Sequence, residues 1–191
     1  METIGRAIKI LLFMMLLTGV AYPLLVTGFA GLVFPHRASG SIILADGKAM
    51  GAELVGQNFS DPRYFWPRPS ATNYDAMPSG GSNLGPTSND LKEMITKRRE
   101  HLRATNDTVV EVPPDLLFAS ASGLDPDITP AAARYQVERI ARARSLDQKA
   151  KTVIFRLIEE HIETPTFGLL GEPRVNVLRL NMALDSLVRN R

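Results

Sequence analysis

The sequence predicts an α+β protein, with one N-terminal transmembrane helix followed by a single extracytoplasmic domain of helices packed on a small sheet. Three observations predict this class. A long uncharged apolar segment lies near the N-terminus, short apolar runs bounded by turn residues follow it, and amphipathic segments with a helical period fill the C-terminal half. The expected divisions are a short cytoplasmic tail at residues 1–9, the transmembrane helix at 10–35 and the soluble domain at 36–191.

The composition excludes several classes of protein. The 191 residues include no cysteine, which rules out disulfides, thiolate metal sites and cysteine nucleophiles. The formal net charge of +2 comes from interspersed acidic and basic residues, so no basic patch indicates a nucleic-acid partner. The 13 prolines and 14 glycines favour many irregular connections over a bundle of long helices.

The N-terminal apolar segment is long enough to cross a bilayer. From Ile10 to Pro35 it contains no charged residue, and as a helix it spans roughly 38 Å, more than the ~30 Å hydrocarbon core. The alternatives are a buried core helix, which needs a polar side, and a cleaved signal peptide, for which Gly28-Phe29-Ala30 has small residues at the cleavage spacing. The apolar region of a signal peptide normally covers only about 7–15 residues, so we expect an uncleaved span.

The charges that flank this span barely discriminate between its two orientations. Arg6 and Lys9 precede it, and Arg37 and Lys48 follow it. A very short N-terminal tail before a long polar domain is nevertheless typical of a signal anchor whose tail stays in the cytoplasm. We therefore expect the large domain to lie outside the cytoplasm and the span to contact membrane lipid.

Two features of the span favour packing on a membrane partner. Pro23 falls in mid-span, where it removes a helix hydrogen bond and tends to kink the axis. Gly19, Thr27, Gly28 and Gly31 leave small surfaces for close contact with other helices. The alternative is that glycine is simply common in membrane helices.

The first half of the soluble domain is expected to hold a hairpin, a long polar connection and a helix. In the segment 41–56, Asp46-Gly47 between two apolar runs is a strong signal for a hairpin turn. The polar segment 70–90 has the composition of a flexible linker, although such a long irregular connection within a domain is often functional. A helix is expected to begin near Thr87 or Ser88, either of which can cap it. Its apolar face comprises Leu91, Met94, Ile95 and Leu102.

Two further helices are expected downstream. One begins at Thr129-Pro130, because proline is tolerated at the first helical position, and continues through Arg144. The next is expected to begin at Ser145, which forms a capping-box pattern with Gln148. Its buried stripe comprises Val153, Ile154, Leu157, Ile158 and Ile162.

Two strands complete the expected elements. Val109–Val112 is rich in β-branched residues and is stopped by Pro113-Pro114. After the glycines at 168 and 171, residues 175–180 are expected to form a strand and residues 181–188 a terminal helical turn or two.

The sequence carries no catalytic or metal-binding constellation. His36, His101 and His161 stand far from any second ligand at metal spacing, so each is expected on the surface. Glu159-Glu160 are adjacent on a helix and therefore point in different directions. The glycine spacing of Gly51–Asn58 resembles a phosphate loop, but the segment lacks the required lysine and hydroxyl.

The stretch GQNFSDPRYFWPRPS, residues 56–70, is the first candidate site. It holds four aromatic residues, two arginines and three prolines, a mixture that neither a helix nor a regular strand explains. Arginines can hold phosphate or stack on aromatic rings, but an extracytoplasmic location disfavours a phosphate ligand. A loop completing the core and a docking surface for a partner remain as alternatives. The candidate docking residues are Arg63, Tyr64, Phe65, Trp66 and Arg68, together with Gly19, Pro23, Gly28 and Gly31 of the span.

The loop SASGLDPDITP, residues 120–130, is the second candidate. Its small residues leave main-chain N–H groups accessible and a helix N-terminus follows, an arrangement that can receive an anion. Asp125 and Asp127 would repel that anion, and Pro130 supplies no N–H. From the residues alone we expect a loop that leads into a helix.

Several long stretches resemble the C subunits of the Kdp-type potassium-transporting ATPases of bacteria. The resemblance covers essentially the whole chain, in the family's order after a single N-terminal span. It is carried by GQNFSDPRYFWPRPSATNY, SGGSNLGPTS, SASGLDPDITPAAARYQVERIARAR and GLLGEPRVNVLRLNMALD.

The resemblance implies a place in an inner-membrane complex that takes up potassium with high affinity at the expense of ATP. Family members join a potassium-binding A subunit, a P-type ATPase B subunit and a small F subunit, and they carry neither the phosphorylated aspartate nor the ion pore. The family is described as a catalytic chaperone that raises the affinity of the B subunit for ATP, with no tightly bound cofactor of its own. By likeness to the ABC-transporter signature, the implied nucleotide contacts are Ser120, Ser122, Gly123 and Gln136.

The expected location conflicts with a direct nucleotide contact. A domain outside the cytoplasm does not meet cytoplasmic ATP, so an effect on ATP affinity has to pass through the membrane helices. We therefore favour an outer-face cap on the pore subunit, where carboxylates such as Asp61 or Asp75 raise the local cation concentration. A membrane-anchored enzyme is the more distant alternative.

Overall fold

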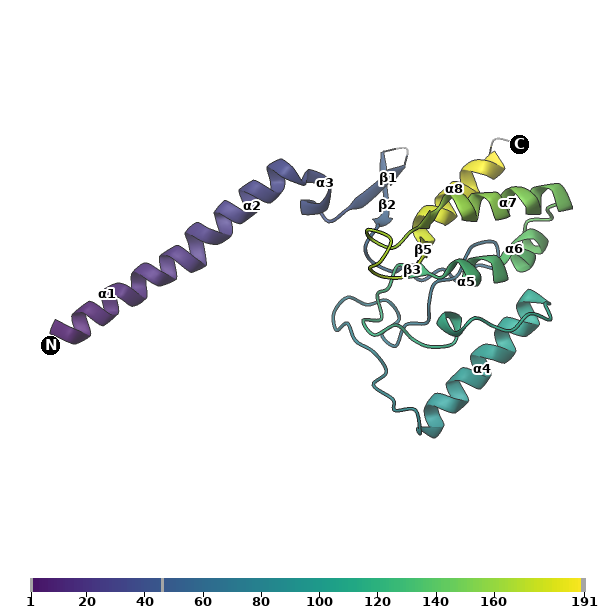
Figure 1. Ribbon diagram of the computed structural model, residues 1–191, viewed down its shortest axis with the longest axis horizontal. Coiled ribbons are helices and arrows are strands. Elements are labelled where there is room, and N and C mark those ends of the chain that lie inside the picture. Colours follow the sequence, from purple (N-terminus) through teal and green to yellow (C-terminus); the bar gives the residue numbers. More distant parts are fainter. Residues whose placement is uncertain (1, 46, 190–191) are drawn as a thin grey trace. The chain divides into compact units, whose positions relative to one another are not determined.

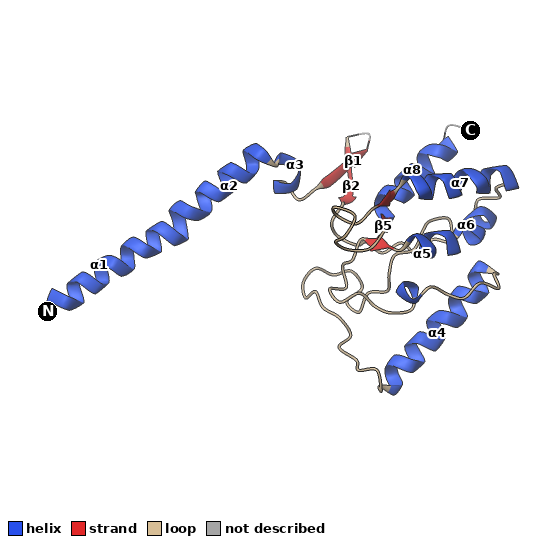
Figure 2. Ribbon diagram, viewed as in Figure 1, coloured by secondary structure: helices blue, strands red, loops and turns tan. Residues whose placement is uncertain are grey.

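The computed structural model describes residues 2–45 and 47–189. Its contacts divide the chain into two compact units, Met1–Ala52 and Glu53–Arg191, and each is described by itself. Helices and small antiparallel sheets occur together in the chain, so the predicted α+β class is confirmed. Figure 2 shows a long irregular segment between the first sheet and the helix that begins at Asn89.

The first unit is dominated by one apolar helical stretch. It consists of α1 (Glu2–Leu16), a π-helical turn (Leu17–Ala21) and α2 (Tyr22–Val33), and a short helix α3 (Pro35–Ala38) follows. The most apolar 18 residues of the stretch have a mean hydropathy of 2.2, and the stretch is long and apolar enough to cross a membrane. Its side chains are not covered by the rest of the chain, as a surface that faces lipid requires.

The π-helical turn has a physical cause in Pro23. Proline has no N–H, and in a regular helix its ring clashes with the carbonyl four residues earlier, which here belongs to Gly19. The turn before it widens, and the N–H of Tyr22 donates to the carbonyl of Leu17, five residues back. The helix therefore continues past Pro23.

A two-stranded hairpin completes the first unit. Strands β1 (Ile42–Ala45) and β2 (Lys48–Ala52) pair antiparallel, with Ala45 opposite Lys48 and Leu44 opposite Ala49. This pairing confirms the predicted hairpin. Asp46, the first residue of the expected Asp46-Gly47 turn, lies outside the described residues, and Gly47 has φ +73°.

The second unit packs helices on a three-stranded antiparallel sheet whose strand order is β3–β5–β4. The strands are β3 (Asp127–Ile128), β4 (Ile162–Glu163) and β5 (Arg174–Asn176). The helices are α4 (Asn89–Asn106), the 3-10 turn η2 (Pro114–Leu116), α5 (Pro130–Tyr135), α6 (Val137–Ala143), α7 (Gln148–Glu160) and α8 (Val177–Arg189). Figure 1 shows α5 and α6 lying between α4 and the neighbouring pair α7 and α8.

The predicted helix starts are confirmed at two of three positions. The hydroxyl of Ser88 accepts from the N–H of Leu91 at the start of α4, and the hydroxyl of Thr129 accepts from Ala132 at the start of α5. The expected helix 130–144 is interrupted at Gln136, which separates α5 from α6.

The third start was predicted at Ser145, and this prediction is wrong. The carboxylate of Asp147 caps α7 by accepting from the N–H of Ala150 at 2.8 Å. Ser145 instead adopts φ +52° and ends α6, with Leu146 N–H donating to the carbonyl of Ala141 in a Schellman motif. Serine and aspartate both serve as caps, and sequence spacing alone does not separate the end of one helix from the start of the next.

The strands predicted at 109–112 and 175–180 also require correction. Val109 and Val110 are exposed and no strand forms at 109–112, because β-branched residues stabilise a strand only against a neighbouring one. The expected strand 175–180 ends at Asn176, whose side-chain oxygen accepts from the N–H of Arg179 and so begins α8. The expected terminal turn is therefore a helix that includes Val177–Leu180.

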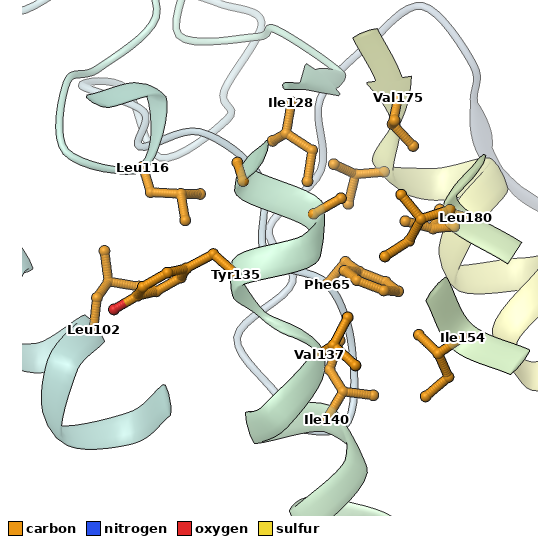
Figure 3. Close-up of a cluster of buried hydrophobic side chains, with 14 of the residues drawn as sticks. Phe65, Leu102, Leu116, Ile128, Tyr135, Val137, Ile140, Ile154, Val175 and Leu180 are labelled. Atoms are coloured by element: carbon orange, nitrogen blue, oxygen red, sulfur yellow. The ribbon is translucent and has the colours of Figure 1, made fainter. Parts of the chain in front are cut away.

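The core of the second unit forms around Phe65, whose side chain is 0% exposed. Figure 3 shows Phe65 between Val137 and Leu180, with Ile154 beyond it and Tyr135 reaching toward Leu102 of α4. These residues belong to one buried cluster that draws on the irregular segment before α4 and on the helices after it. The other buried members include Val112, Leu116, Ile128, Ile140, Ile158, Val175 and Leu184.

Two side-chain amides hold the main chain of Phe65 and Trp66, and we call this arrangement the amide clasp. Asn181 of α8 accepts from the N–H of Phe65 at 2.8 Å and donates to its carbonyl at 3.0 Å. Gln136 accepts from the N–H of Trp66 at 2.7 Å and donates to its carbonyl at 3.1 Å. The two amides thus supply the hydrogen bonds that a neighbouring strand would otherwise provide, so the extended chain can lie buried without one.

Two arginines complete the enclosure of this segment. Arg139 donates to the carbonyls of Pro62 and Tyr64 and to the side-chain oxygen of Gln136. Arg144 donates to the carbonyl of Arg63 at 2.8 Å. Burial lowers the pKa of Arg139 to about 9, so the guanidinium stays protonated at neutral pH and its donors remain available.

We expect Asn181→Leu to destabilise the second unit by roughly 2–5 kcal/mol, because it leaves the buried N–H and carbonyl of Phe65 without partners. Urea unfolding of the full chain in detergent, followed by the fluorescence of the single tryptophan, measures the change. Ser186→Ala on the same helix is the control and should change stability by less than about 0.5 kcal/mol. An equally small effect of Asn181→Leu would contradict the clasp.

The corrected start of α7 gives a second prediction. Asp147→Ala should cost about 1 kcal/mol of unfolding free energy, because the N–H of Ala150 loses its cap. Ser145→Gly should cause no loss, since glycine adopts φ +52° without strain. The opposite ranking of the two unfolding midpoints in urea would restore Ser145 as the cap.

Candidate functional site

The candidate docking residues of the segment 56–70 divide into a buried and an exposed set. Phe65 lies in the core, while Arg63 is exposed and Tyr64, Trp66 and Arg68 are partly exposed. The hydroxyl of Tyr64 donates to the carboxylate of Asp185 at 2.9 Å. Four of the five predicted side chains are therefore at least partly exposed at the protein surface, and the fifth, Phe65, is buried.

The two arginines of the segment are each paired with a carboxylate. Arg63 binds Asp61 through Nε and Nη2, with the shortest separation 2.7 Å, and this contact lowers the pKa of Asp61 to about 2. Arg68 donates to Asp125 at 2.9 Å, and both side chains are partly buried. Both guanidinium groups therefore already hold a carboxylate, which partly neutralises their charge toward an anionic ligand.

The ring of Trp66 lies between two other groups. The guanidinium carbon of Arg139 is 3.6 Å from the ring centroid, and the ring of His101 stacks on it at 5.5 Å with an interplanar angle of 11°. The indole N–H donates to the carbonyl of Asp61 at 3.0 Å. These contacts fix the orientation of the ring.

A small pocket of about 220 Å³ opens beside Trp66, and we call it the aromatic pocket. Tyr74 forms part of its wall and donates its hydroxyl to the carbonyl of Arg68 at 2.6 Å. Burial raises the pKa of Tyr74 to about 12, so the hydroxyl keeps its proton. The lining comprises Phe59, Ser60, Trp66, Pro67, Tyr74 and His101.

Sequence reasoning did not find this pocket. Its walls come from residues 59–67, from the nearby Tyr74 and from the more distant His101, and these residues carry no shared spacing. His101 was expected to be a surface histidine, and its side chain is indeed exposed. The signal that was available is the density of aromatic residues in 56–70, which is unusual for a loop.

The loop 120–125 packs tightly against the segment 69–81. The N–H of Ser120 donates to the carbonyl of Pro69, and the N–H of Gly80 donates to the carbonyl of Ser122. Gly123 has φ +71°, and a Cβ placed on it would lie 2.6 Å from the hydroxyl oxygen of Thr72. Only glycine fits this position, because both the backbone angle and the space exclude a side chain.

The implied nucleotide contacts are already engaged inside the protein. The N–H of Gly123 donates to the carbonyl of Ser120 at 3.3 Å, and the hydroxyl of Ser122 accepts from the N–H of Leu124 at 3.1 Å. The structure brings Ser120, Ser122 and Gly123 together in one loop. Gln136 is fully buried and uses both ends of its amide in the clasp.

The span presents its small residues on an uncovered surface. Gly19 lies in the π-helical turn, and Pro23, Gly28 and Gly31 lie in α2. A Cβ placed on any of the three glycines meets nothing within 4 Å, so their surfaces are open within this chain. Gly28 and Gly31 are three residues apart and therefore share one side of the helix.

The described residues contain no group of three or more His, Cys, Asp or Glu that could hold a metal ion. Asp127 is the carboxyl whose pKa is raised, by burial first and by the nearby charge of Asp125 second. Its side chain pairs with Arg174 at 3.1 Å rather than with a base or a nucleophile. The aromatic pocket and the residues around it therefore remain the candidate site.

Comparison with known proteins identifies the family. The family described as "KdpC: K+-transporting ATPase, c chain" matches residues 4–186. The chain is 53% identical over 192 residues, 98% of this chain and 96% of the relative, to the potassium-transporting ATPase KdpC subunit of Polaromonas naphthalenivorans (strain CJ2). It is 51% identical over 189 residues, 97% and 96% of the two chains, to that of Variovorax paradoxus (strain S110). The chain therefore belongs to the family of KdpC subunits of K+-transporting ATPases.

Proposed function

We propose that this chain is a non-catalytic accessory subunit of a bacterial high-affinity, ATP-driven potassium uptake complex. The observation that carries the proposal is the family match, which runs from residue 4 to residue 186 and so includes both the span and the domain. We place the protein in the inner membrane, with its N-terminus in the cytoplasm and its domain outside. The proposed partners are the potassium-binding A subunit, the P-type ATPase B subunit and the small F subunit.

Two surfaces are proposed to hold the subunit in the complex. In the membrane, Gly19, Gly28 and Gly31 allow close approach of another helix, beside the proline-induced π turn. Outside it, the aromatic pocket and the neighbouring Tyr64 would receive side chains of the pore subunit. Aromatic residues and arginines in partly enclosed sites are typical interface anchors, which supports this assignment.

Any effect of the subunit on ATP affinity is proposed to act through the membrane helices. A tenfold increase in ATP affinity requires a coupling free energy of about 1.4 kcal/mol between the two sites. The internal hydrogen bonds of Ser120, Gly123 and Gln136 support this route over a nucleotide contact by these residues, since ATP would have to replace them. The catalytic chaperone role of the subunit is thus proposed as coupling at a distance.

A cap on the outer face of the pore subunit would also shape the access of potassium. Asp61 is a weak candidate for attracting cations, because Arg63 balances its charge. Asp75 is exposed, and its Oδ1 accepts from the N–H of Met77 rather than from an arginine, so it is the better candidate. Its charge would raise the local cation concentration near the pore.

Cysteine labelling tests the proposed topology, since the chain contains no cysteine. In intact spheroplasts, an impermeant maleimide should label the exposed Ser79→Cys variant without lysis and should label the Thr3→Cys variant only after lysis. The reversed pattern would place the domain in the cytoplasm and would revive direct contact with ATP.

Truncation of the aromatic pocket tests the proposed docking surface. Trp66→Ala should lower co-purification of the other ATPase subunits at least tenfold, because it removes an interface anchor worth about 2 kcal/mol or more. Phe155→Ala, an exposed aromatic residue outside this pocket, is the matched control. Far-UV circular dichroism of both variants checks that the helices remain folded. Normal assembly of folded Trp66→Ala would leave Trp66 with a purely structural role.

A further inference from the structure

The turn between β4 and β5 exposes three large apolar side chains. Phe167 is 90% exposed, Leu169 85% and Leu170 64%. The segment from Thr164 to Gly171 contains no charged residue. Single exposed apolar residues are common on protein surfaces, but three within four positions form a cluster that calls for a partner. We call these three side chains the apolar tip.

The apolar tip is held in a fixed shape. The N–H of Thr166 donates to the carbonyl of Leu170 at 2.9 Å, and the N–H of Leu170 donates back to Thr166 at 3.0 Å. A third bond, from Gly168 to Pro165, closes the turn at 2.9 Å. The tip is thus a hydrogen-bonded turn rather than a loose loop.

Phe167 adopts a strained backbone conformation within this turn. Its φ is +56°, a left-handed value that glycine or asparagine adopts readily and that bulky residues rarely adopt. The following Gly168 has φ +72°, where no strain arises. The strain at Phe167 is not offset by burial of its ring in this chain, because the ring faces solvent. Uncompensated strain of this kind points to a function for the side chain.

The strands that carry the tip also carry ion pairs. Arg174 of β5 binds Glu163 of β4 at 2.8 Å and Asp127 of β3 at 3.1 Å. Arg179 at the start of α8 binds Glu53 at 2.6 Å. An apolar turn thus projects from strands that carry charged side chains, and interfaces likewise combine an apolar centre with a polar rim.

We propose that the apolar tip is a docking element that inserts into an apolar pocket on another subunit of the same ATPase. The proposal rests on the proposed function, which supplies a partner subunit for this chain. Because the turn is already ordered, it loses little conformational entropy on binding. This raises affinity only for a partner whose surface has the complementary shape. The tip and the aromatic pocket would then be separate contacts with the membrane-embedded part of the complex.

The bilayer is the other apolar partner available to a membrane-anchored chain, and two observations favour a protein. A fluid bilayer accepts side chains in any arrangement, so it does not account for a strained, hydrogen-bonded turn. The charged residues that flank the tip along the chain are Glu163 and Glu172, whereas segments that bind anionic membrane surfaces are rich in lysine and arginine.

The main test uses the full chain co-expressed with the other subunits of the ATPase. Leu169→Asp places a charge on the tip and should lower co-purification of those subunits at least tenfold. Val109→Asp is the matched control, because Val109 is a fully exposed apolar residue outside the tip, and this variant should assemble normally. Normal assembly of Leu169→Asp would overturn the proposal while leaving the proposed function in place. Failure of the unaltered chain to co-purify would instead count against the proposed function.

Phe167→Gly separates docking from folding. Glycine relieves the strain at φ +56°, so this variant should unfold at the same or a higher urea concentration than the unaltered chain. It also removes the aromatic side chain and should weaken assembly at least fivefold. A variant that is both more stable and fully assembled would show that the ring makes no contact with a partner.

A fluorescent label distinguishes a protein pocket from lipid. Leu169→Cys, labelled with an environment-sensitive dye before reconstitution of the complex, should emit at shorter wavelength than the same labelled chain alone. Its emission should be unchanged in vesicles made from brominated phosphatidylcholine, which quenches dyes within the bilayer. Strong quenching by the brominated lipid would assign the tip to the membrane and would overturn the protein partner.

Discussion

The amide clasp on Phe65 and Trp66 is the constraint on which the second unit depends. An extended, proline-rich segment has few ways to satisfy its main-chain groups, yet Phe65 has to enter the core to fill it. Gln136 and Asn181 resolve this conflict by bonding the main chain of two successive residues, while Arg139 covers the carbonyls before them. The helices that carry these side chains are thereby held around one segment, and the aromatic pocket takes its shape from the same contacts.

The sequence predicted correctly those elements that depend on neighbouring residues. It failed where contacts between residues far apart in the chain determine the structure. The apolar N-terminal helix, the hairpin and the caps at Ser88 and Thr129 follow from a long apolar run, turn residues and capping residues. Val109–Val112 has strand propensity but no neighbouring strand, and the run 175–180 changes from strand to helix because Asn176 caps α8. The candidate site shows the same limit. The residues of the stretch 56–70 stood out by composition, but nothing local indicated that Asn181, 116 positions after Phe65, would hold it.

The structure also explains why a search for chemistry in the sequence finds none. Its conspicuous polar residues are used to build the fold: Arg63 and Arg68 hold carboxylates, Gln136 and Arg139 hold main chain, and Gly123 allows two loops to touch. Removing a side chain that is committed in this way leaves its partner without a hydrogen bond and so lowers stability.

The position of Asn181 has a consequence for the order in which the protein acquires its structure. The partners of the clasp are separated by 116 residues for Phe65 and Asn181 and by 70 for Trp66 and Gln136. Because a ribosome delivers the chain from its N-terminus, Phe65 emerges long before α8 exists and has to wait for it. During that interval the aromatic stretch lacks both its main-chain partners and its core, and non-local contacts of this kind close slowly. The core around Phe65 is therefore completed only after α8 has been synthesised.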